Sequence, residues 1–364
     1  MTQKLQFQSP IAVLGLMSGS SLDGLDLVLC HFTYHNSQWH YEILAAQTVP
    51  YPNEIKKRLH YAIYGSAIEY VSLDIELGRF MASSVSEFLK DRPIKPILLA
   101  SHGHTIFHQP QHGITSQIGC GAVLAAQTGI TTICDFRTTD VALEGQGAPL
   151  VPIGDELLFG QYDACLNLGG FSNISYRKDH KRMAFDISPC NMVLNALAQK
   201  LAKEYDENGN MARTGQCNQV LLNELNQLEY YQQLGAKSLG KEWVDDIFFP
   251  IIERSPLSLQ DQLATVCHHI AYQIARSCSL IPKSQNCPTM LVTGGGANNR
   301  YLVELIQSYT SCQIIIPDNL TINFKEAIIF AFLGLLRFYE QNNCLKDVTG
   351  AKSDCCGGAI YLKV

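Results

Sequence analysis

The chain has 364 residues, of which 46% are hydrophobic and 16% charged, and its formal net charge is -6. This length exceeds the size at which one hydrophobic core usually stops growing, so we expect two lobes with a ligand site in the cleft between them. The apolar content excludes a largely disordered chain, and the acidic balance excludes a broad basic surface for nucleic acid or an anionic membrane.

Cysteine usage and apolar runs predict a cytoplasmic protein. Thirteen cysteines are scattered without a C-x-x-C pair, which is typical of reduced thiols in a core. The first residues lack the apolar region of a signal peptide. The longest late apolar run, residues 327–336, is too short to span a bilayer. We therefore expect a buried helix there and no membrane partner.

The first predicted element is a β-hairpin over residues 11–30, with a turn rich in glycine, serine and aspartate. This turn, residues 18–24, offers backbone amides for a phosphate and the carboxylate of Asp23 for a metal. It differs from a P-loop, which needs a lysine after its glycines and a helix after its strand. The alternative is an ordinary tight turn between two strands.

The next segments alternate between strand and helix patterns. A strand pattern within residues 31–49 is followed by helical periodicity over 54–90 and by a short apolar strand at 93–101. This alternation indicates an α/β lobe.

A histidine-rich segment continues from that strand, with His102, His104, His108 and His112 close in sequence. No cysteine or carboxylate joins these histidines, and a proline-broken loop is a poor frame for fixed ligand geometry. We therefore do not expect a metal site in this segment.

Residues 135–152 contain two residues of opposite charge and two glycines. Asp135 and Arg137 form a charged pair, and Gly145 and Gly147 lack a Cβ, so the backbone there could approach a ligand closely. A hinge stiffened by the prolines at 149 and 152 is the alternative, and the two interpretations are compatible.

A second hairpin pattern at residues 164–176 repeats the layout of the first. Its turn carries Gly169 and Gly170, and Asn173 follows. Two glycine-rich hairpins far apart in the chain indicate duplicated lobes that face one nucleotide.

Asp186 comes shortly before a predicted helix at residues 192–203. An aspartate in this place is either a helix N-cap or a functional carboxylate, and the residues alone leave both open.

The last third of the chain contains a strand, a glycine turn and a helix at residues 290–299. A turn with Gly294, Gly295 and Gly296 lets a phosphate or a flat ring lie against bare backbone at a helix N-terminus. Glu326 follows in what we expect to be the first turn of the final apolar helix, where the helix dipole alone would favour it.

These motifs, in this order, resemble those of the anhydro-N-acetylmuramic acid kinases, which are sugar kinases of the actin/hexokinase/Hsp70 superfamily. The resemblance rests on residues 15–26, 101–105, 135–137, 145–152, 185–191, 237–242, 326–327 and 348–351. In the segment 185–191 the family reads Phe-Asp-Thr-Gly-Pro-Gly-Asn. Ile187, Ser188 and Cys190 replace the threonine and the two glycines here.

The resemblance implies an α/β, two-lobed actin-like ATPase fold, a duplicated RNase H-like fold with a central interlobe cleft. Residues 1–140 with the returning tail 345–364 would form the N-terminal lobe, and residues 141–344 the C-terminal lobe with nucleotide-binding loops.

It also implies an ATP- and Mg²⁺-dependent kinase of cell-wall recycling. Such an enzyme opens the anhydro bridge of 1,6-anhydro-N-acetylmuramic acid with water and phosphorylates O6, giving N-acetylmuramic acid 6-phosphate and ADP. A kinase for another anhydro sugar, such as levoglucosan, and a non-catalytic actin-like regulator are the alternatives. A homodimer is the default oligomer.

Residue roles carry over by position. Asp186 would be the catalytic base, and Asp23 a ligand of Mg²⁺. The expected sugar-binding residues are His102, Thr105, Asp135, Arg137, Gln146 and Glu326. The expected ATP- and phosphate-binding residues are Gly19, Ser20, Ser21, Leu22, Asp23, Gly24, Leu25, Asp26, Gly169, Gly170, Asn173, Gly294, Gly295, Gly296 and Asn298.

Overall fold

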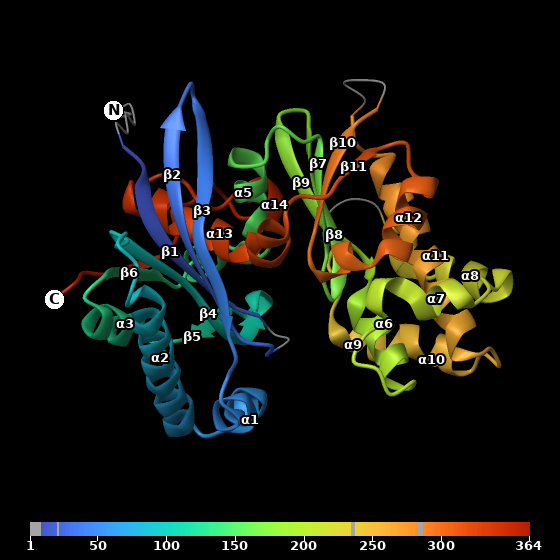
Figure 1. Cartoon of the computed structure of the whole chain (residues 1–364), viewed down its shortest axis with the longest axis horizontal. Coiled ribbons are helices and arrows are strands. Elements are labelled where there is room, and N and C mark those ends of the chain that lie inside the picture. Colours follow the sequence, from blue (N-terminus) through green and yellow to red (C-terminus); the bar gives the residue numbers. More distant parts are fainter. Residues whose placement is uncertain (1–8, 20–21, 234–236, 283–286) are drawn as a thin grey trace. The chain divides into compact units, whose positions relative to one another are not determined.

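The structure of the protein, a computed structural model, describes residues 9–19, 22–233, 237–282 and 287–364. The chain divides into two compact units (Figure 1). The first unit contains residues 1–158 and 324–364, and the second contains residues 159–323. Each unit is built around its own mixed sheet.

The sheet of the first unit has seven strands in the order β12-β6-β4-β1-β2-β3, with β5 paired to β4. Strands β1, β2 and β3 are antiparallel neighbours, whereas β4 runs parallel to β1 and β6 parallel to β4. The strands are β1 (Ile11–Ser18), β2 (Leu25–His35), β3 (Gln38–Val49), β4 (Leu98–Gln109), β5 (Ile114–Ile118), β6 (Thr131–Cys134) and β12 (Ala359–Tyr361). The helices are α1 (Asn53–Tyr61), α2 (Ala67–Leu89), α3 (Gly121–Thr128), α4 (Thr138–Ala142), α5 (Val151–Leu157), α13 (Asn319–Phe338) and α14 (Lys346–Thr349).

Helices cover both faces of this sheet, which explains why β1 is apolar along almost its whole length. Leu14 and Leu16 pack in one cluster with Leu77 and other residues of α2. Gly15 points to the opposite face because side chains alternate along a strand. A Cβ on Gly15 would lie 2.2 Å from the carbonyl oxygen of Ala327 in α13, so this strand and this helix need glycine at their contact.

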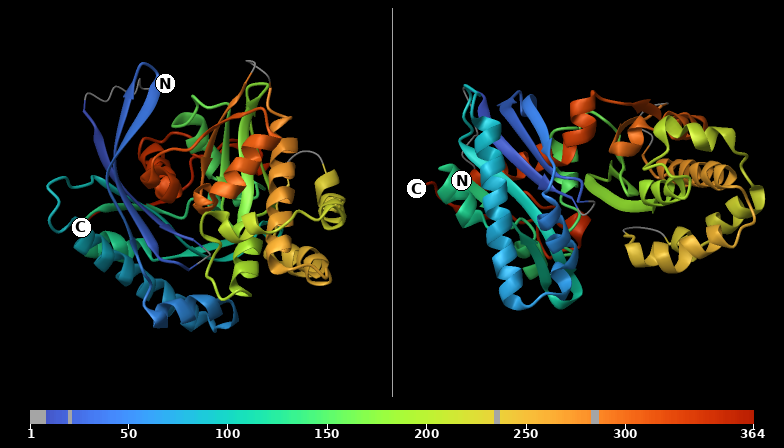
Figure 2. Two further views of the ribbon diagram at one scale, coloured as in Figure 1. Left: turned by 45° about the vertical axis from the view of Figure 1, so that its right-hand side comes forward. Right: turned by 60° about the horizontal axis from the view of Figure 1, so that its bottom comes forward.

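Helix α13 is a core helix of the first unit. It is long and apolar enough to cross a membrane by length and composition, but 78% of its most apolar window is buried within the protein. Its red ribbon lies beside the blue N-terminal strands in Figure 1 and in the left view of Figure 2. Phe332 contacts Phe32 of β2 with ring centroids 5.5 Å apart. The buried helix expected at residues 327–336 is therefore confirmed, and it begins earlier, at Asn319.

The sheet of the second unit has five strands in the order β11-β10-β7-β8-β9. They are β7 (Ala164–Leu168), β8 (Phe171–Lys178), β9 (Lys181–Pro189), β10 (Thr289–Thr293) and β11 (Gln313–Ile315). The first three strands are antiparallel neighbours, and β10 and β11 continue parallel to β7. Read from β9 to β11 and numbered by their place in the chain, these strands lie side by side in the order third, second, first, fourth, fifth. The strands β3, β2, β1, β4 and β6 of the first unit lie in the same order. The two units therefore repeat one topology, and the expected α/β fold with duplicated, actin-like units is confirmed.

The second unit buries its apolar residues between this sheet and its helices, above all α11. The side chain of Ser258 caps α11 by accepting a hydrogen bond from the Asp261 N–H. The helices are α6 (Asn191–Gln199), α7 (Asn210–Thr214), α8 (Gln219–Asn226), α9 (Lys241–Trp243), α10 (Phe249–Glu253), α11 (Leu259–Cys278) and α12 (Arg300–Tyr309).

The unit boundaries lie at 158/159 and 323/324, whereas the sequence suggests 140/141 and 344/345. The difference concerns α5 and most of α13, which pack on each other in the first unit. A Cβ on Gly154 of α5 would lie 2.6 Å from the Ile329 side chain. Asp155 of α5 also forms a buried ion pair with Lys325 of α13.

Candidate functional site

Asp186 lies on β9, at an irregularity in the pairing of β8 with β9. Asn173 is opposite Asp186 and Ser172 is opposite Ser188, so Ile187 is the extra residue of a bulge. Such bulges redirect side chains, and they are frequent beside active sites. The position therefore brings the predicted catalytic carboxylate next to Asn173, a predicted phosphate-binding residue.

The segment around residue 237 holds Asp186 from a second side. The Leu239 N–H donates to Oδ2 of Asp186 at 2.9 Å, and the Asp186 N–H donates to the Lys237 carbonyl oxygen at 3.0 Å. Burial raises the pKa of the Asp186 carboxyl above its ordinary value, and the Leu239 hydrogen bond opposes that shift. The carboxylate is thus fixed in place while one oxygen has no partner among the described residues.

The helix-cap interpretation of Asp186 is wrong. Helix α6 begins at Asn191 with Cys190 as its N-cap residue, and Asp186 belongs to the preceding strand. The three residues that depart from the family pattern are all buried in the second unit. Ile187 and Cys190 belong to its apolar core, and the Ser188 hydroxyl pairs with the Ser172 hydroxyl at 3.0 Å.

The turn between β7 and β8 meets the start of α6. The carbonyl oxygen of Gly169 accepts the Asn191 N–H at 3.1 Å, and that of Gly170 accepts the Cys190 N–H at 2.8 Å. A Cβ on Gly170 would have only the end of Met192 near it, at 3.9 Å. The turn therefore satisfies helix amides through its carbonyl groups and keeps an open backbone surface at Gly170.

The glycine turn after β10 packs against the end of β7. Gly294 has φ +82°, and a Cβ there would lie 2.5 Å from Oδ1 of Asn167. A Cβ on Gly296 would lie 2.7 Å from the Leu168 side chain, whereas one on Gly295 would meet nothing closer than 3.7 Å. The structure thus brings the two predicted nucleotide loops of the second unit together at Leu168. Asn298 is exposed in the same turn, and the next residue caps α12.

In the first unit, the buried His102 pairs with the half-buried Arg137. Nη2 and Nε of Arg137 donate to Nε2 of His102 at 2.9 and 3.3 Å, and Nη1 donates to the Gly147 carbonyl oxygen at 2.7 Å. Because arginine only donates, Nε2 must accept, and Nδ1–H donates to the Gly103 carbonyl oxygen at 2.9 Å. Burial and Arg137 hold the pKa of His102 well below its usual value. His102 is therefore neutral, and the pair connects β4 with the glycine loop.

Glu326 is electrostatically coupled to this pair. The Glu326 side chain has some surface exposed to solvent, but many protein atoms lie near its carboxyl group. These atoms displace water from the carboxyl group, and this desolvation raises its pKa. Arg137 and Lys325 act in the opposite direction and favour the carboxylate. Glu326 lies well inside α13, which begins at Asn319, so a place in the first helical turn does not explain it.

The remaining predicted sugar residues lie around the same loop. Thr105 is half-buried on β4, where it pairs with Gln117 of β5. Asp135 has φ +57° and accepts a hydrogen bond from the Thr138 hydroxyl at 2.5 Å. Gln146 is exposed, and its backbone N–H donates to the Thr349 carbonyl oxygen at 2.8 Å.

The first hairpin is described except for Ser20 and Ser21, which lie outside the described residues. The Leu22 N–H donates to the Gly19 carbonyl oxygen at 3.2 Å, and Leu25 begins β2 in the core. Gly24 is required by packing, because a Cβ there would lie 2.8 Å from the Val49 carbonyl oxygen of β3.

Two carboxylates of this hairpin suit a magnesium ion. Asp23 is exposed, and Asp26 accepts a hydrogen bond from the Thr48 hydroxyl at 2.6 Å. Burial raises the pKa of Asp26, and the charge of Asp23 raises it further. Mg²⁺ is commonly held by one or two carboxylates together with phosphate oxygens and water. Asp26 also raises the pKa of Glu326, so this hairpin lies within electrostatic reach of the sugar residues in the same unit.

A buried chain of hydrogen bonds that no local sequence pattern indicates lies beside the hairpin. The Tyr51 hydroxyl donates to Oγ of Ser18 at 2.6 Å, and this Oγ lies 2.8 Å from Nδ1 of His104. Burial lowers the pKa of His104 to about 4, so this histidine is neutral. The His-x-His spacing was the available signal, but it gave no hint of partners at residues 18 and 51.

Asp140 of α4, beside the glycine loop, is a buried residue whose role no local sequence pattern indicates. Its Oδ2 accepts the Gly147 N–H at 2.7 Å, and its Oδ1 accepts the Thr349 hydroxyl at 2.7 Å. A Cβ on Gly145 would lie 2.2 Å from Oδ2. The glycines of this loop therefore fold around a buried carboxylate, which fixes the carbonyl group that Arg137 binds.

Comparison with known proteins shows the family of the chain. The family description "Anhydro-N-acetylmuramic acid kinase" matches residues 11–363. The chain belongs to the anhydro-N-acetylmuramic acid kinase family. The kinase of that name from Hydrogenovibrio crunogenus is 33% identical over 96% of this chain and 97% of its own. The one from Mannheimia succiniciproducens is 33% identical over 96% and 98%.

Among solved structures, the ADPNP-bound activator of 2-hydroxyisocaproyl-CoA dehydratase from Clostridium difficile covers 91% of this chain and 98% of its own at 13% identity. The TM-score is 0.42. A likeness of this size decides nothing about function.

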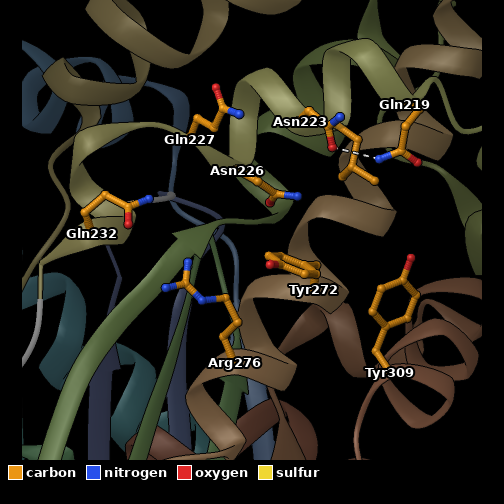
Figure 3. A pocket seen from close by; sticks show the side chains of 9 residues that line it. Gln219, Asn223, Asn226, Gln227, Gln232, Tyr272, Arg276 and Tyr309 are labelled. Atoms are coloured by element: carbon orange, nitrogen blue, oxygen red, sulfur yellow. Dashed lines mark hydrogen bonds between the residues drawn. The ribbon is translucent and has the colours of Figure 1, made fainter.

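The second unit also contains a polar pocket of about 590 Å³ (Figure 3). Amide side chains of α8 and residues Tyr272 and Arg276 of α11 line it, and Gln219 and Asn223 hydrogen bond to each other at 2.8 Å. None of the residues that carry the family resemblance lines this pocket. We therefore assign it no part in the kinase site.

Proposed function

We propose that the chain is an ATP-dependent kinase of 1,6-anhydro-N-acetylmuramic acid in cell-wall recycling. It hydrolyses the anhydro bridge and phosphorylates O6, which yields N-acetylmuramic acid 6-phosphate and ADP. Family membership supports the reaction. The observation that carries the proposal is the placement of Asp186, a carboxylate fixed on a bulge with one oxygen turned away from its backbone hydrogen bond.

Asp186 serves as the general base. Its free oxygen takes a proton from the water molecule that attacks the anomeric carbon of the sugar. As the new carbon–oxygen bond forms, the bond from the anomeric carbon to the bridge oxygen breaks, and the bridge oxygen becomes O6. This O6 attacks the γ-phosphorus of ATP, and ADP leaves. A positioned base of this kind contributes rate enhancements of about 10² to 10⁴.

The polar cluster around Arg137 in the first unit binds the sugar. Glu326 accepts hydrogen bonds from sugar hydroxyls, and Arg137 holds that carboxylate ionised against its own burial. His102 is kept neutral and oriented by Arg137, so it positions the guanidinium without competing for charge. Thr105, Asp135 and Gln146 are the further candidates for polar contacts with the sugar.

The glycine turns bind ATP. Gly170 and Gly295 keep backbone that no neighbouring side chain covers, which lets phosphate oxygens or the nucleoside approach closely. Asp23, with the carboxylate of Asp26 in electrostatic reach, would hold Mg²⁺, which neutralises charge on the phosphates when bound. We propose that the enzyme works in the cytoplasm, where ATP is available, and a homodimer remains the expected oligomer.

The departures at residues 187, 188 and 190 do not favour another sugar. All three side chains are buried in the second unit and bonded or packed there, so they leave Asp186 and its hydrogen bonds in place. We therefore propose 1,6-anhydro-N-acetylmuramic acid, and not levoglucosan, as the preferred substrate.

The test is incubation of the purified protein with Mg-ATP and 1,6-anhydro-N-acetylmuramic acid, with ADP and sugar products followed by mass. We expect a product heavier by one water and one phosphoryl unit, and much slower turnover of levoglucosan. Faster turnover of levoglucosan would assign the other sugar. Absence of any sugar-dependent ADP release would support a nucleotide-binding regulator instead.

A further inference from the structure

A cluster of three potential metal ligands lies buried in the first unit, beside the loop that Arg137 contacts. Its members are Asp140 of α4 and the thiols of Cys344 and Cys355 near the C-terminus. Their ligand atoms all lie within 4.8 Å of one another. Cys344 and Cys355 form an antiparallel bridge, and each donates its N–H to the carbonyl oxygen of the other, at 3.1 and 3.2 Å. Directly paired residues of this kind place their side chains on the same face.

The carboxylate of Asp140 is bonded differently at its two oxygens. Oδ2 accepts the Gly147 N–H at 2.7 Å, a bond that shapes the glycine loop. Oδ1 accepts the Thr349 hydroxyl at 2.7 Å and, at 3.1 Å, the thiol of Cys344. A thiol is a weak donor. Its contact with Oδ1 is therefore the one that a cation could replace without disturbing the glycine loop.

We propose that Asp140, Cys344 and Cys355 form a binding site for a thiophilic divalent cation of the zinc class. Zinc combines thiolates at about 2.3 Å with a carboxylate oxygen at about 2.0 to 2.2 Å, usually in a tetrahedron. Two thiolates in such a tetrahedron are about 3.8 Å apart, given that bond length. The two sulfur atoms, which lie within 4.8 Å of each other, therefore need to approach by about 1 Å at most. The Cys344 sulfur and Oδ1 of Asp140, 3.1 Å apart now, would separate by roughly half an ångström.

The surroundings supply what the three ligands lack. The Thr349 hydroxyl is the neighbouring oxygen for the fourth position, and water is the alternative. Both thiols lose their protons to solvent when the cation binds, so affinity falls in acid. The two thiolates and the carboxylate carry three negative charges, and a divalent cation leaves one of these charges uncompensated. Arg137 interacts electrostatically with Asp140 and Cys344 and offsets this excess.

The bound cation would tie the C-terminal segment to α4. The segment from Cys344 to Cys355 contains Thr349, whose carbonyl oxygen accepts the Gln146 N–H. A cation that joins Cys344 and Cys355 to Asp140 would fix both ends of this segment, and it would stabilise the glycine loop through the hydrogen bond between Thr349 and Gln146. This inference does not depend on the sugar or the nucleotide, and it stands or falls separately from the proposed kinase reaction.

The test is titration of the full-length, reduced and metal-free protein with Co²⁺, whose bonds to thiolates give a charge-transfer absorption band. We expect one Co²⁺ per chain, displaced by Zn²⁺, with release of thiol protons. In C344S and C355S the band should be lost or the affinity should fall by more than about 100-fold, because loss of even an outer-shell partner costs 10 to 100-fold. Zn²⁺ should also raise the melting temperature of the wild type but not of these variants.

Matched cysteine variants separate this site from other thiols. Cys356 is adjacent in sequence but outside the trio, and Cys312 forms a separate thiol pair with Cys278. We expect C356S and C312S to retain the band and its stoichiometry. A wild type without a thiolate band, or a band that persists in both C344S and C355S, would overturn the proposal. In that case the trio is a hydrogen-bonded cluster of thiols around a structural carboxylate. Circular dichroism of each variant establishes that loss of the band is not loss of folding.

Discussion

Replacing Asp186 with asparagine separates catalysis from stability in the second unit. Asparagine has the same shape, and its side-chain oxygen can accept the Leu239 N–H that Oδ2 accepts now. The fold therefore keeps its hydrogen bond, but the side chain can no longer take a proton. Loss of a general base lowers kcat by about 10² to 10⁴, which corresponds to about 2.7 to 5.4 kcal/mol of transition-state stabilisation.

The expected effect on stability has the opposite sign. Burial raises the pKa of Asp186 above its ordinary 3.8, so the folded protein binds that proton more tightly than the unfolded chain does. Its favourable contribution is complete below the unfolded pKa and is lost as the pH rises through the folded value. At neutral pH the ionised carboxylate is thus a cost that asparagine removes, and Asp186→Asn should melt at the same or a higher temperature.

Asp206→Asn is the matched control in the same unit. Asp206 is buried, and its two oxygens accept the N–H groups of Met211 at 2.8 Å and Ala212 at 2.9 Å. Asparagine can serve only one of them, so the variant should lose about 1 to 3 kcal/mol of stability while kcat is kept. The assays are sugar-dependent ADP release and thermal unfolding at pH 7. Asp186→Asn with kcat within tenfold of wild type, or clearly less stable than wild type, would refute the reasoning.

Three further outcomes follow from single contacts. Lys325→Met removes the cation that lies 2.7 Å from a buried aspartate oxygen and should cost up to about 3 to 5 kcal/mol in denaturant unfolding. Gly294→Ala places a Cβ 2.5 Å from a neighbouring oxygen at a residue with φ +82°, so it should lower the free energy of unfolding by more than about 1 kcal/mol. Gly295→Ala meets no such contact and should leave the stability nearly unchanged, and thermal unfolding of both variants tests this difference. Arg137→Gln removes a charge that lowers the pKa of Glu326, so the acid limb of the kcat/KM profile should move to higher pH; an unmoved limb contradicts the assigned role.

The strand patterns and the ordered motifs were enough to predict the duplicated α/β architecture. Alternation in two separate hairpins, each with a glycine turn, indicated two units before their strand orders were known. The unit boundaries were harder to place, because α5 and α13 join the first unit through a contact between residues 154 and 329, which are far apart in sequence.

Long-range polar contacts account for what the sequence could not reveal. Ser18 and His104 are separated by 86 positions, and Asp140 and Thr349 by 209. No local pattern specifies such pairs, since each residue alone reads as an ordinary strand or helix residue. Asp186 was ambiguous for the same reason. Its choice between a cap and a strand position depends on a bulge opposite Ser172 and Asn173.

The glycines of the family motifs do not all have the same task. Gly24 and Gly145 would each place a Cβ less than 3 Å from a neighbouring backbone or carboxylate oxygen, so the fold alone requires them. Gly170 and Gly295 have no such neighbour. A glycine that packing does not require is free to serve a ligand, because only the bare backbone distinguishes it from alanine. Among the glycines of the second unit's two turns, Gly170 and Gly295 are therefore where a substitution should weaken ATP binding more than it weakens the fold.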